Sequence, residues 1–112
     1  MMNPADLEAD MYDCAGRLEQ VTEAMAARAV AAARAEHAYK VKSALEFVAA
    51  RAQGQPVAQC EALAIIACDL ELIARLEADA LLDSAKEAGR NARARGEILR
   101  SINSNHRTLT TG

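Results

Sequence analysis

Aromatic residues are nearly absent from this chain of 112 residues, which has no Trp and only Tyr12, Tyr39 and Phe47. The hydrophobic content of 52% is carried mainly by alanine and leucine. This composition suits helices that approach closely and is poor for the thick core of a globular domain. The length allows one domain, close to the size at which a single small core becomes marginal.

Cysteine is also scarce, and Cys14, Cys60 and Cys68 form no CxxC motif. Cys60 and Cys68 would lie about 12 Å apart along one helix, which is too far for a disulfide. We interpret all three as core thiols of a reducing compartment. The first four residues lack the features of a signal peptide, and no apolar run approaches the length of a membrane span. We therefore expect a cytoplasmic protein that does not enter a membrane.

Motifs typical of catalysis are missing as well. The sequence has no Ser/His/Asp or Cys/His arrangement, no Gly-rich phosphate loop and no HExxH motif. His37 has no second histidine nearby, so we interpret it as a solvated or satisfied side chain and not as a metal ligand. We expect neither enzyme activity nor a cofactor.

One strong break interrupts a chain that otherwise favours helix. Pro56 can begin a helix but cannot continue one, and Gly54 can adopt the left-handed conformation that closes the preceding helix. Asn3 is a good N-cap and Pro4 suits the first helical position. The sequence thus predicts helices over about residues 4–52 and 56–103, joined by a turn at 53–56.

The first predicted helix carries the strongest periodic signal. Its apolar residues recur at alternating spacings of four and three, the a/d pattern of a coiled coil. We define the heptad seam as these residues: Leu7, Met11, Cys14, Leu18, Val21 and Met25. The pattern predicts an all-α, coiled-coil-like antiparallel helical hairpin. Two helices cannot bury both of their flanks, so we expect the hairpin to form a homo-oligomer through apolar seams.

The second predicted helix has its own apolar stripe: Val57, Cys60, Leu63, Ile66, Leu70, Ile73 and Leu76. The polar run at residues 101–105 favours local side-chain hydrogen bonds over continued helix. We therefore expect one domain over residues 1–103 and a flexible tail over 104–112. Gly16 and Gly89 are weak points where either helix could bend.

Charge is distributed unevenly beneath the overall value of −3. Residues 1–24 carry a net −5, whereas residues 86–112 carry a net +4. In a hairpin both segments lie at the open end, where they could neutralise each other between helices or subunits. Alternatively, Arg93, Arg100 and Arg107 repeat every seven residues, so a helix would align them along a phosphate backbone, with Arg90 close by.

Several short segments resemble the phage recombination mediator family typified by UvsY. They are Ala38-Tyr39-Lys40-Val41-Lys42-Ser43-Ala44-Leu45, the turn at Gly54, Cys68-Asp69-Leu70-Glu71, and Ala94-Arg95-Gly96-Glu97-Ile98-Leu99-Arg100-Ser101-Ile102. The resemblance covers about residues 30–103.

This resemblance implies a small homo-oligomeric helical protein that binds single-stranded DNA. Such a mediator loads a RecA-like recombinase onto strands coated by a single-strand-binding protein, here in an infected host cell. The resemblance places Lys40, Lys42, Arg95 and Arg100 at the DNA. Arg90, Arg93 and Arg107 join them by spacing alone. Without the resemblance, we interpret Tyr39 as packed in the hairpin, with Lys40 and Lys42 in water.

A second hypothesis is a structural adaptor or chaperone. It would offer the seam residues Leu7, Met11, Leu18, Val21 and Met25 to a partner helix. A third, an inhibitor of a host protein, fits any small acidic chain and makes no specific prediction.

Overall fold

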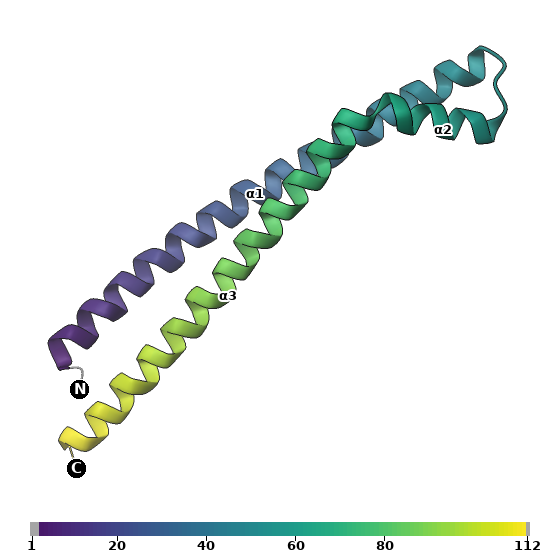
Figure 1. The fold of residues 1–112 in the computed structure, drawn as a ribbon. Coiled ribbons are helices and arrows are strands. Elements are labelled where there is room, and N and C mark those ends of the chain that lie inside the picture. Colours follow the sequence, from purple (N-terminus) through teal and green to yellow (C-terminus); the bar gives the residue numbers. More distant parts are fainter. Residues whose placement is uncertain (1–2, 112) are drawn as a thin grey trace. The chain divides into compact units, whose positions relative to one another are not determined.

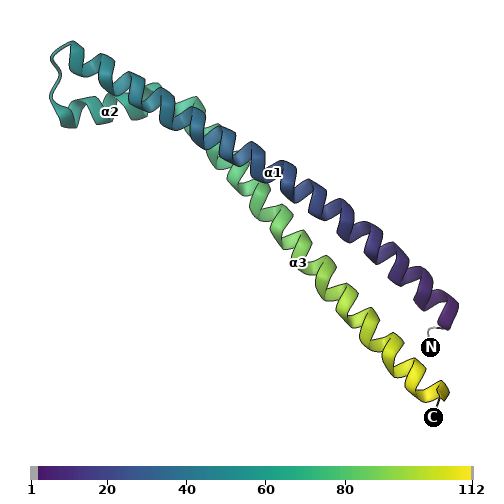
Figure 2. The ribbon, with the colours of Figure 1, turned by 180° about the vertical axis from the view of Figure 1, so that it is seen from behind.

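The computed structural model describes the backbone of residues 3–111 and the side chains of residues 3–107. Its regular elements are the helices α1 (Pro4–Ala52), α2 (Val57–Ala67) and α3 (Asp69–Thr111), as Figures 1 and 2 show. The chain forms two compact units. Unit 1 combines Met1–Ala27 with Asp83–Gly112, and unit 2 comprises Arg28–Leu82. Helices pack antiparallel in each unit, which confirms the predicted all-α helical hairpin.

Both ends of α1 form for the reasons expected from the sequence. The side-chain Oδ1 of Asn3 accepts a hydrogen bond from the Asp6 N–H at 2.9 Å, which caps the helix. At the other end, Gly54 has a φ of 85° and its N–H donates to the Arg51 carbonyl at 2.9 Å. Only glycine adopts this conformation without strain, so the turn is encoded locally. Between these ends α1 continues through Gly16.

The second half of the hairpin differs from the single helix predicted from residue 56. α2 ends at Ala67 and α3 begins at Asp69, with Cys68 between them at φ −102° and ψ 19°. The Cys68 N–H is shared between the carbonyls of Ala64 and Ile65, and the Cys68 carbonyl still accepts from Leu72. A shared N–H of this kind loosens one turn without ending the hydrogen-bond ladder.

α3 also extends further than predicted. It reaches Thr111, whereas the sequence predicted an end near residue 103 and a flexible tail over 104–112, of which Gly112 lies outside the described residues. Asn103 and His106 follow Leu99 at steps of four and three residues and are half-buried. These positions continue the face of α3 that packs in unit 1, and packing of this kind overrides the weak helix propensity of the polar run.

The buried residues are mostly small. In unit 1, Leu7, Cys14 and Leu99 form a cluster, with Met11 packed against it. Unit 2 instead buries alanines and cysteines: Ala32, Ala50, Cys60, Ala64 and Cys68. Small side chains allow close approach of two helices but bury little apolar area.

The apolar stripe predicted on the second helix faces mostly outward in the structure. Among its members Cys60 is fully buried, whereas the others are 40–77% exposed: Val57, Leu63, Ile66, Leu70, Ile73 and Leu76. The buried positions Ala64 and Cys68 each lie one or two residues away from this stripe. A shift of one residue turns a helix by about 100°, so the large residues face outward.

Candidate nucleic-acid interface

The heptad seam packs inside unit 1, against α3. Leu7, Met11, Leu18, Val21 and Met25 are all buried or half-buried. A Cβ atom built on Gly89 would lie 2.9 Å from Met25 Cε and 3.6 Å from Val21 Cγ1, so α3 approaches α1 closely at this glycine. The Cys14 thiol donates to the Ala92 carbonyl at 3.6 Å. The residues predicted to bind a partner helix are therefore engaged within the chain in this structure.

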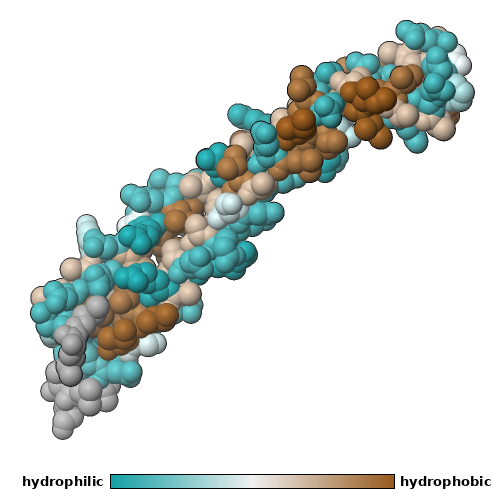
Figure 3. Space-filling model, viewed as in Figure 1, coloured by the Kyte–Doolittle hydropathy of each residue, from teal (hydrophilic) through white to brown (hydrophobic). Residues whose placement is uncertain are grey.

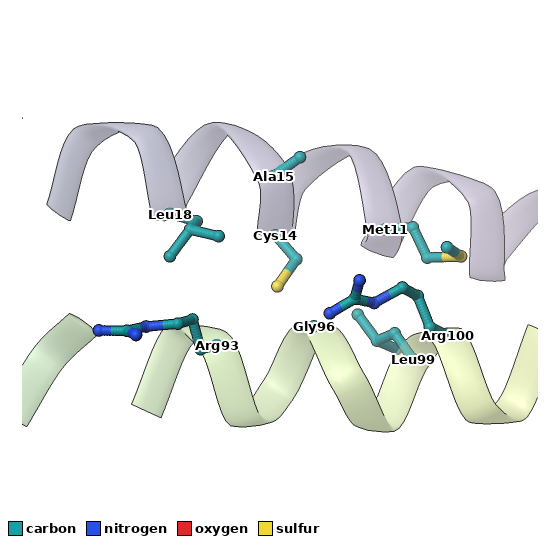
Figure 4. Close-up of a pocket in the computed structure, with 8 residues that line it drawn as sticks. All are labelled: Met11, Cys14, Ala15, Leu18, Arg93, Gly96, Leu99 and Arg100. Atoms are coloured by element: carbon teal, nitrogen blue, oxygen red, sulfur yellow. The ribbon is translucent and has the colours of Figure 1, made fainter. Parts of the chain in front are cut away.

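A hollow of about 260 Å³ opens between α1 and α3 in unit 1. Its apolar lining comes mainly from Met11, Cys14, Leu18 and Leu99, with Gly96 at its floor. Figure 4 shows these side chains pointing from the two helices toward each other. A Cβ atom built on Gly96 would lie 3.6 Å from Cys14 Sγ, so the backbone of α3 comes close to the Cys14 side chain beside the hollow.

Two arginines border this hollow. Arg93 and Arg100 both line it, and in Figure 4 the Arg100 side chain turns into the space between the helices while Arg93 extends along α3. Within the described side chains, residues 3–107, neither guanidinium forms an ion pair with a carboxylate. Each therefore keeps its charge and its donors available for an anion.

These arginines belong to a longer line of cations on α3. Lys86, Arg93, Arg100 and Arg107 are spaced by seven residues, and all four are exposed. We call these four residues the basic row. Side chains seven apart lie on one side of a helix, and the row spans about 31 Å along α3 at the usual rise per residue. Lys86 was missed by the sequence interpretation, although the spacing of seven from Arg93 was the signal that could have found it.

The remaining predicted DNA contacts on α3 lie elsewhere. The guanidinium of Arg90 binds Glu87 Oε2 at 2.6 and 3.1 Å, so a carboxylate of the same helix already compensates its charge. Arg95 is exposed but lies two residues from Arg93, which places it on a different side of α3. The structure thus brings Arg93 and Arg100 together at the hollow, and does not bring Arg90 and Arg95 there.

The two predicted lysines belong to unit 2, and both are paired with carboxylates. Lys40 Nζ lies 3.0 Å from Glu36 Oε1, and Lys42 Nζ donates to Glu71 Oε1 at 2.8 Å. The hydrogen bond from Lys42 lowers the pKa of Glu71, and the same bond raises the pKa of Lys42. Likewise, the hydrogen bond from Lys40 lowers the pKa of Glu36. Paired lysines offer less to a phosphate than the arginines at the hollow.

Tyr39 contacts an arginine of the opposite helix. The Arg75 guanidinium carbon lies 5.6 Å from the centre of the Tyr39 ring, within cation–π distance, and Arg75 also lies 3.7 Å from Glu36. The sequence interpretation missed these contacts between helices. Continuing the heptad seam along α1 by steps of three and four reaches Tyr39 and Lys42, so the pattern itself held the signal.

Comparison of this chain with protein-family models, curated proteins and solved structures finds no match. Within residues 3–111 no helix is long and apolar enough to cross a membrane. The same part of the chain contains no group of three or more His, Cys, Asp or Glu residues that could hold a metal ion. The geometry of the basic row and the hollow is therefore the basis for a functional proposal.

Proposed function

We propose that this chain is a non-enzymatic protein that binds single-stranded DNA along the basic row. The observation that carries the proposal is that Arg93 and Arg100 border an apolar hollow and have no carboxylate partner among the described side chains. Arginine binds phosphate oxygens with two parallel N–H donors, and this geometry is available only to a guanidinium that is not already paired.

The spacing of the basic row favours a nucleic-acid strand, and not a compact anion, as the ligand. Successive members of the row lie about 10 Å apart along α3, so a single phosphate can reach only one of them. A flexible strand can follow all four. Each contact releases counterions, which couples affinity to salt concentration.

The hollow favours single-stranded DNA, and not a duplex, as the ligand. An apolar surface between helices can accept the face of a base, but only where that base is not held in a base pair. Bases ordinarily stack on aromatic side chains, which this chain has in small number. Met11, Leu18 and the planar guanidinium of Arg100 would supply the contact here.

The role of a recombination mediator, which loads a RecA-like recombinase onto DNA coated by a single-strand-binding protein, is the finer form of this proposal and depends on the family resemblance. The adaptor hypothesis requires the heptad seam to leave α3 before it can meet a partner helix. The two hypotheses therefore differ in what a charge on Leu18 does. Under the mediator hypothesis, a charge on Leu18 would unfold unit 1 and lower the helicity. Under the adaptor hypothesis, the variant would stay helical but would no longer bind its partner.

The test is fluorescence anisotropy with a labelled oligonucleotide of about 30 nucleotides, which exceeds a typical site size. Binding would be measured between about 50 and 200 mM salt for wild type, for Arg93→Ala/Arg100→Ala and for Arg17→Ala/Arg28→Ala. The last variant removes the same charge from exposed positions of α1 and is the matched control.

Four phosphate contacts predict a slope of log K against log salt near −2.8, and removal of two predicts about −1.4. The control should keep the wild-type slope. Absence of binding at low salt would refute the proposal, as would an equal loss in the control variant, since that outcome reflects net charge and not the row.

A further inference from the structure

Unit 2 places several polar side chains between the helices and several large apolar side chains outside. Between α1 and α3, Lys42 pairs with Glu71, and Arg75 contacts Tyr39 and Glu36. All five isoleucines of the chain, at positions 65, 66, 73, 98 and 102, are at least 42% exposed, and three of these lie in unit 2. Fully burying such a side chain stabilises a protein by roughly 1.5–3 kcal/mol, of which the single chain gains only part.

Six exposed apolar residues of unit 2 lie on one side of its helix pair. On α1, Val41 and Leu45 each precede an inward residue, Lys42 and Glu46, by one position. On α2 and α3, Leu63 and Leu70 likewise precede Ala64 and Glu71. In two antiparallel helices, the residues one position before the inward residues of each helix point to the same side of the pair.

We call this surface the outer face. It consists of Val41, Leu45, Val48, Leu63, Ile66 and Leu70, which are between 40% and 77% exposed. Figure 3 shows apolar side chains gathered on unit 2, around α2.

The area of exposed surface exceeds what a monomer of this mass presents. The chain exposes 8132 Å², whereas a compact 12.0 kDa monomer exposes about 6,000 Å². A stable interface needs about 800 Å² from each partner. The surplus over the whole chain, about 2,100 Å², exceeds this area.

The charges at the end of the outer face match those of a second copy. Arg34 lies seven residues before Val41, and Glu77 lies seven residues after Leu70, so each extends the face on its own helix. The Lys42–Glu71 and Glu36–Arg75 pairs set the antiparallel register of the two helices. In this register Arg34 lies at the same height along the pair as Glu77, to within one residue. Both are exposed, and within residues 3–107 they form no ion pair with each other.

We propose that the outer face binds the outer face of a second copy of this chain, giving an antiparallel four-helix bundle with a two-fold axis parallel to the helices. This symmetry lays α1 of one copy on α3 of the other without changing their level. Arg34 then meets Glu77 of the second copy, and the same pair forms again across the axis. An apolar cluster with two opposite charges at one end is self-complementary in this arrangement alone. The other two-fold that brings the two faces together stacks α1 on α1, so Arg34 does not meet Glu77 there.

The experiment is sedimentation velocity on the full chain from about 1 to 100 µM, with circular dichroism to confirm helicity. Wild type should reach a mass of twice 12.0 kDa. Leu70→Glu should weaken the dimer at least about a hundredfold, because the dimer loses Leu70 from both copies. Ile98→Glu is the matched control, since Ile98 is 60% exposed on α3 in unit 1 and should leave the dimer intact.

A charge exchange tests the register. Arg34→Glu should weaken the dimer about tenfold by placing two acids together twice, and Arg34→Glu/Glu77→Arg should restore it to within about threefold. A wild-type monomer at the highest concentration would overturn the proposal, as would a larger oligomer. So would dissociation by Ile98→Glu but not by Leu70→Glu, or a monomer whose outer face captures a different protein.

Discussion

Adjacent residues on α3 allow the core of unit 1 to be tested with two closely matched variants. Leu99 is 5% exposed and contacts Leu7 and Cys14, whereas Ile98 is 60% exposed. Replacing either residue by alanine removes the same number of carbon atoms, three, from neighbouring positions of one helix. Any difference in stability therefore reports burial and not composition.

The expected magnitudes follow from these exposures. Three buried carbons contribute about 2.4 kcal/mol at about 0.8 kcal/mol each. Leu99→Ala should destabilise the fold by about 2.5–3 kcal/mol, near the lower end for such a change, because the vacated space adjoins a hollow that is already open. Ile98 is mostly exposed, so Ile98→Ala loses less than half of that contribution, and alanine also has the higher helix propensity. Its cost should therefore be about 1 kcal/mol or less.

Urea unfolding followed by far-UV circular dichroism, at one protein concentration, gives both values. In a thermal scan Leu99→Ala should lower Tm by roughly 10 °C. Equal losses for the two variants would refute the assignment of Leu99 to the core. A cost below about 1 kcal/mol for Leu99→Ala would show that the Leu7–Cys14–Leu99 cluster does not hold the helices together.

Two further predictions concern backbone and charge. Gly16→Ala, which adds a Cβ with nothing within 4 Å, should stabilise the protein by about 0.5–1 kcal/mol, whereas Gly54→Ala should destabilise it by about 1–2 kcal/mol because its φ is positive. Urea midpoints measure both, and an equal sign for the two would contradict this account. The hydrogen bond between Lys42 and Glu71 raises the pKa of Lys42 from its ordinary value of 10.5 and lowers the pKa of Glu71 from its ordinary value of 4.5, so the pair stabilises the fold between these two ordinary values. The midpoint difference between wild type and Lys42→Met should therefore shrink as the pH falls through the lowered pKa of Glu71 or rises through the raised pKa of Lys42, and a constant difference would disprove the link.

Local signals predicted the helix limits where they were strong. The start of α1 at Pro4 and its end at Ala52 were both predicted, because Asn3, Gly54 and Pro56 act through their own backbone. The heptad seam was equally predictable, since its apolar residues have no competing stripe in the first helix. The loosened turn at Cys68 has no such signal in the sequence, and the burial of its side chain is known only from the fold.

Within the candidate interface, the arginine repeat was visible in the sequence, but the hollow beside it was not. Glu87 pairs with Arg90 at a spacing of three residues, which the sequence contains. Only the fold shows that Arg93 borders a hollow. A hollow depends on two helices meeting at Gly96, which no single-helix pattern contains.

By itself, the sequence determined that the chain is helical, where it turns and which end carries each charge, because caps, turns and heptads act over a few residues. The tertiary structure alone decided which of two adjacent stripes faces inward in unit 2. A helix with polar and apolar stripes one residue apart can present either, and the register with the partner helix selects between them. In unit 2 that register places Lys42 against Glu71 and leaves Leu45 and Leu70 outside, where a second surface can cover them.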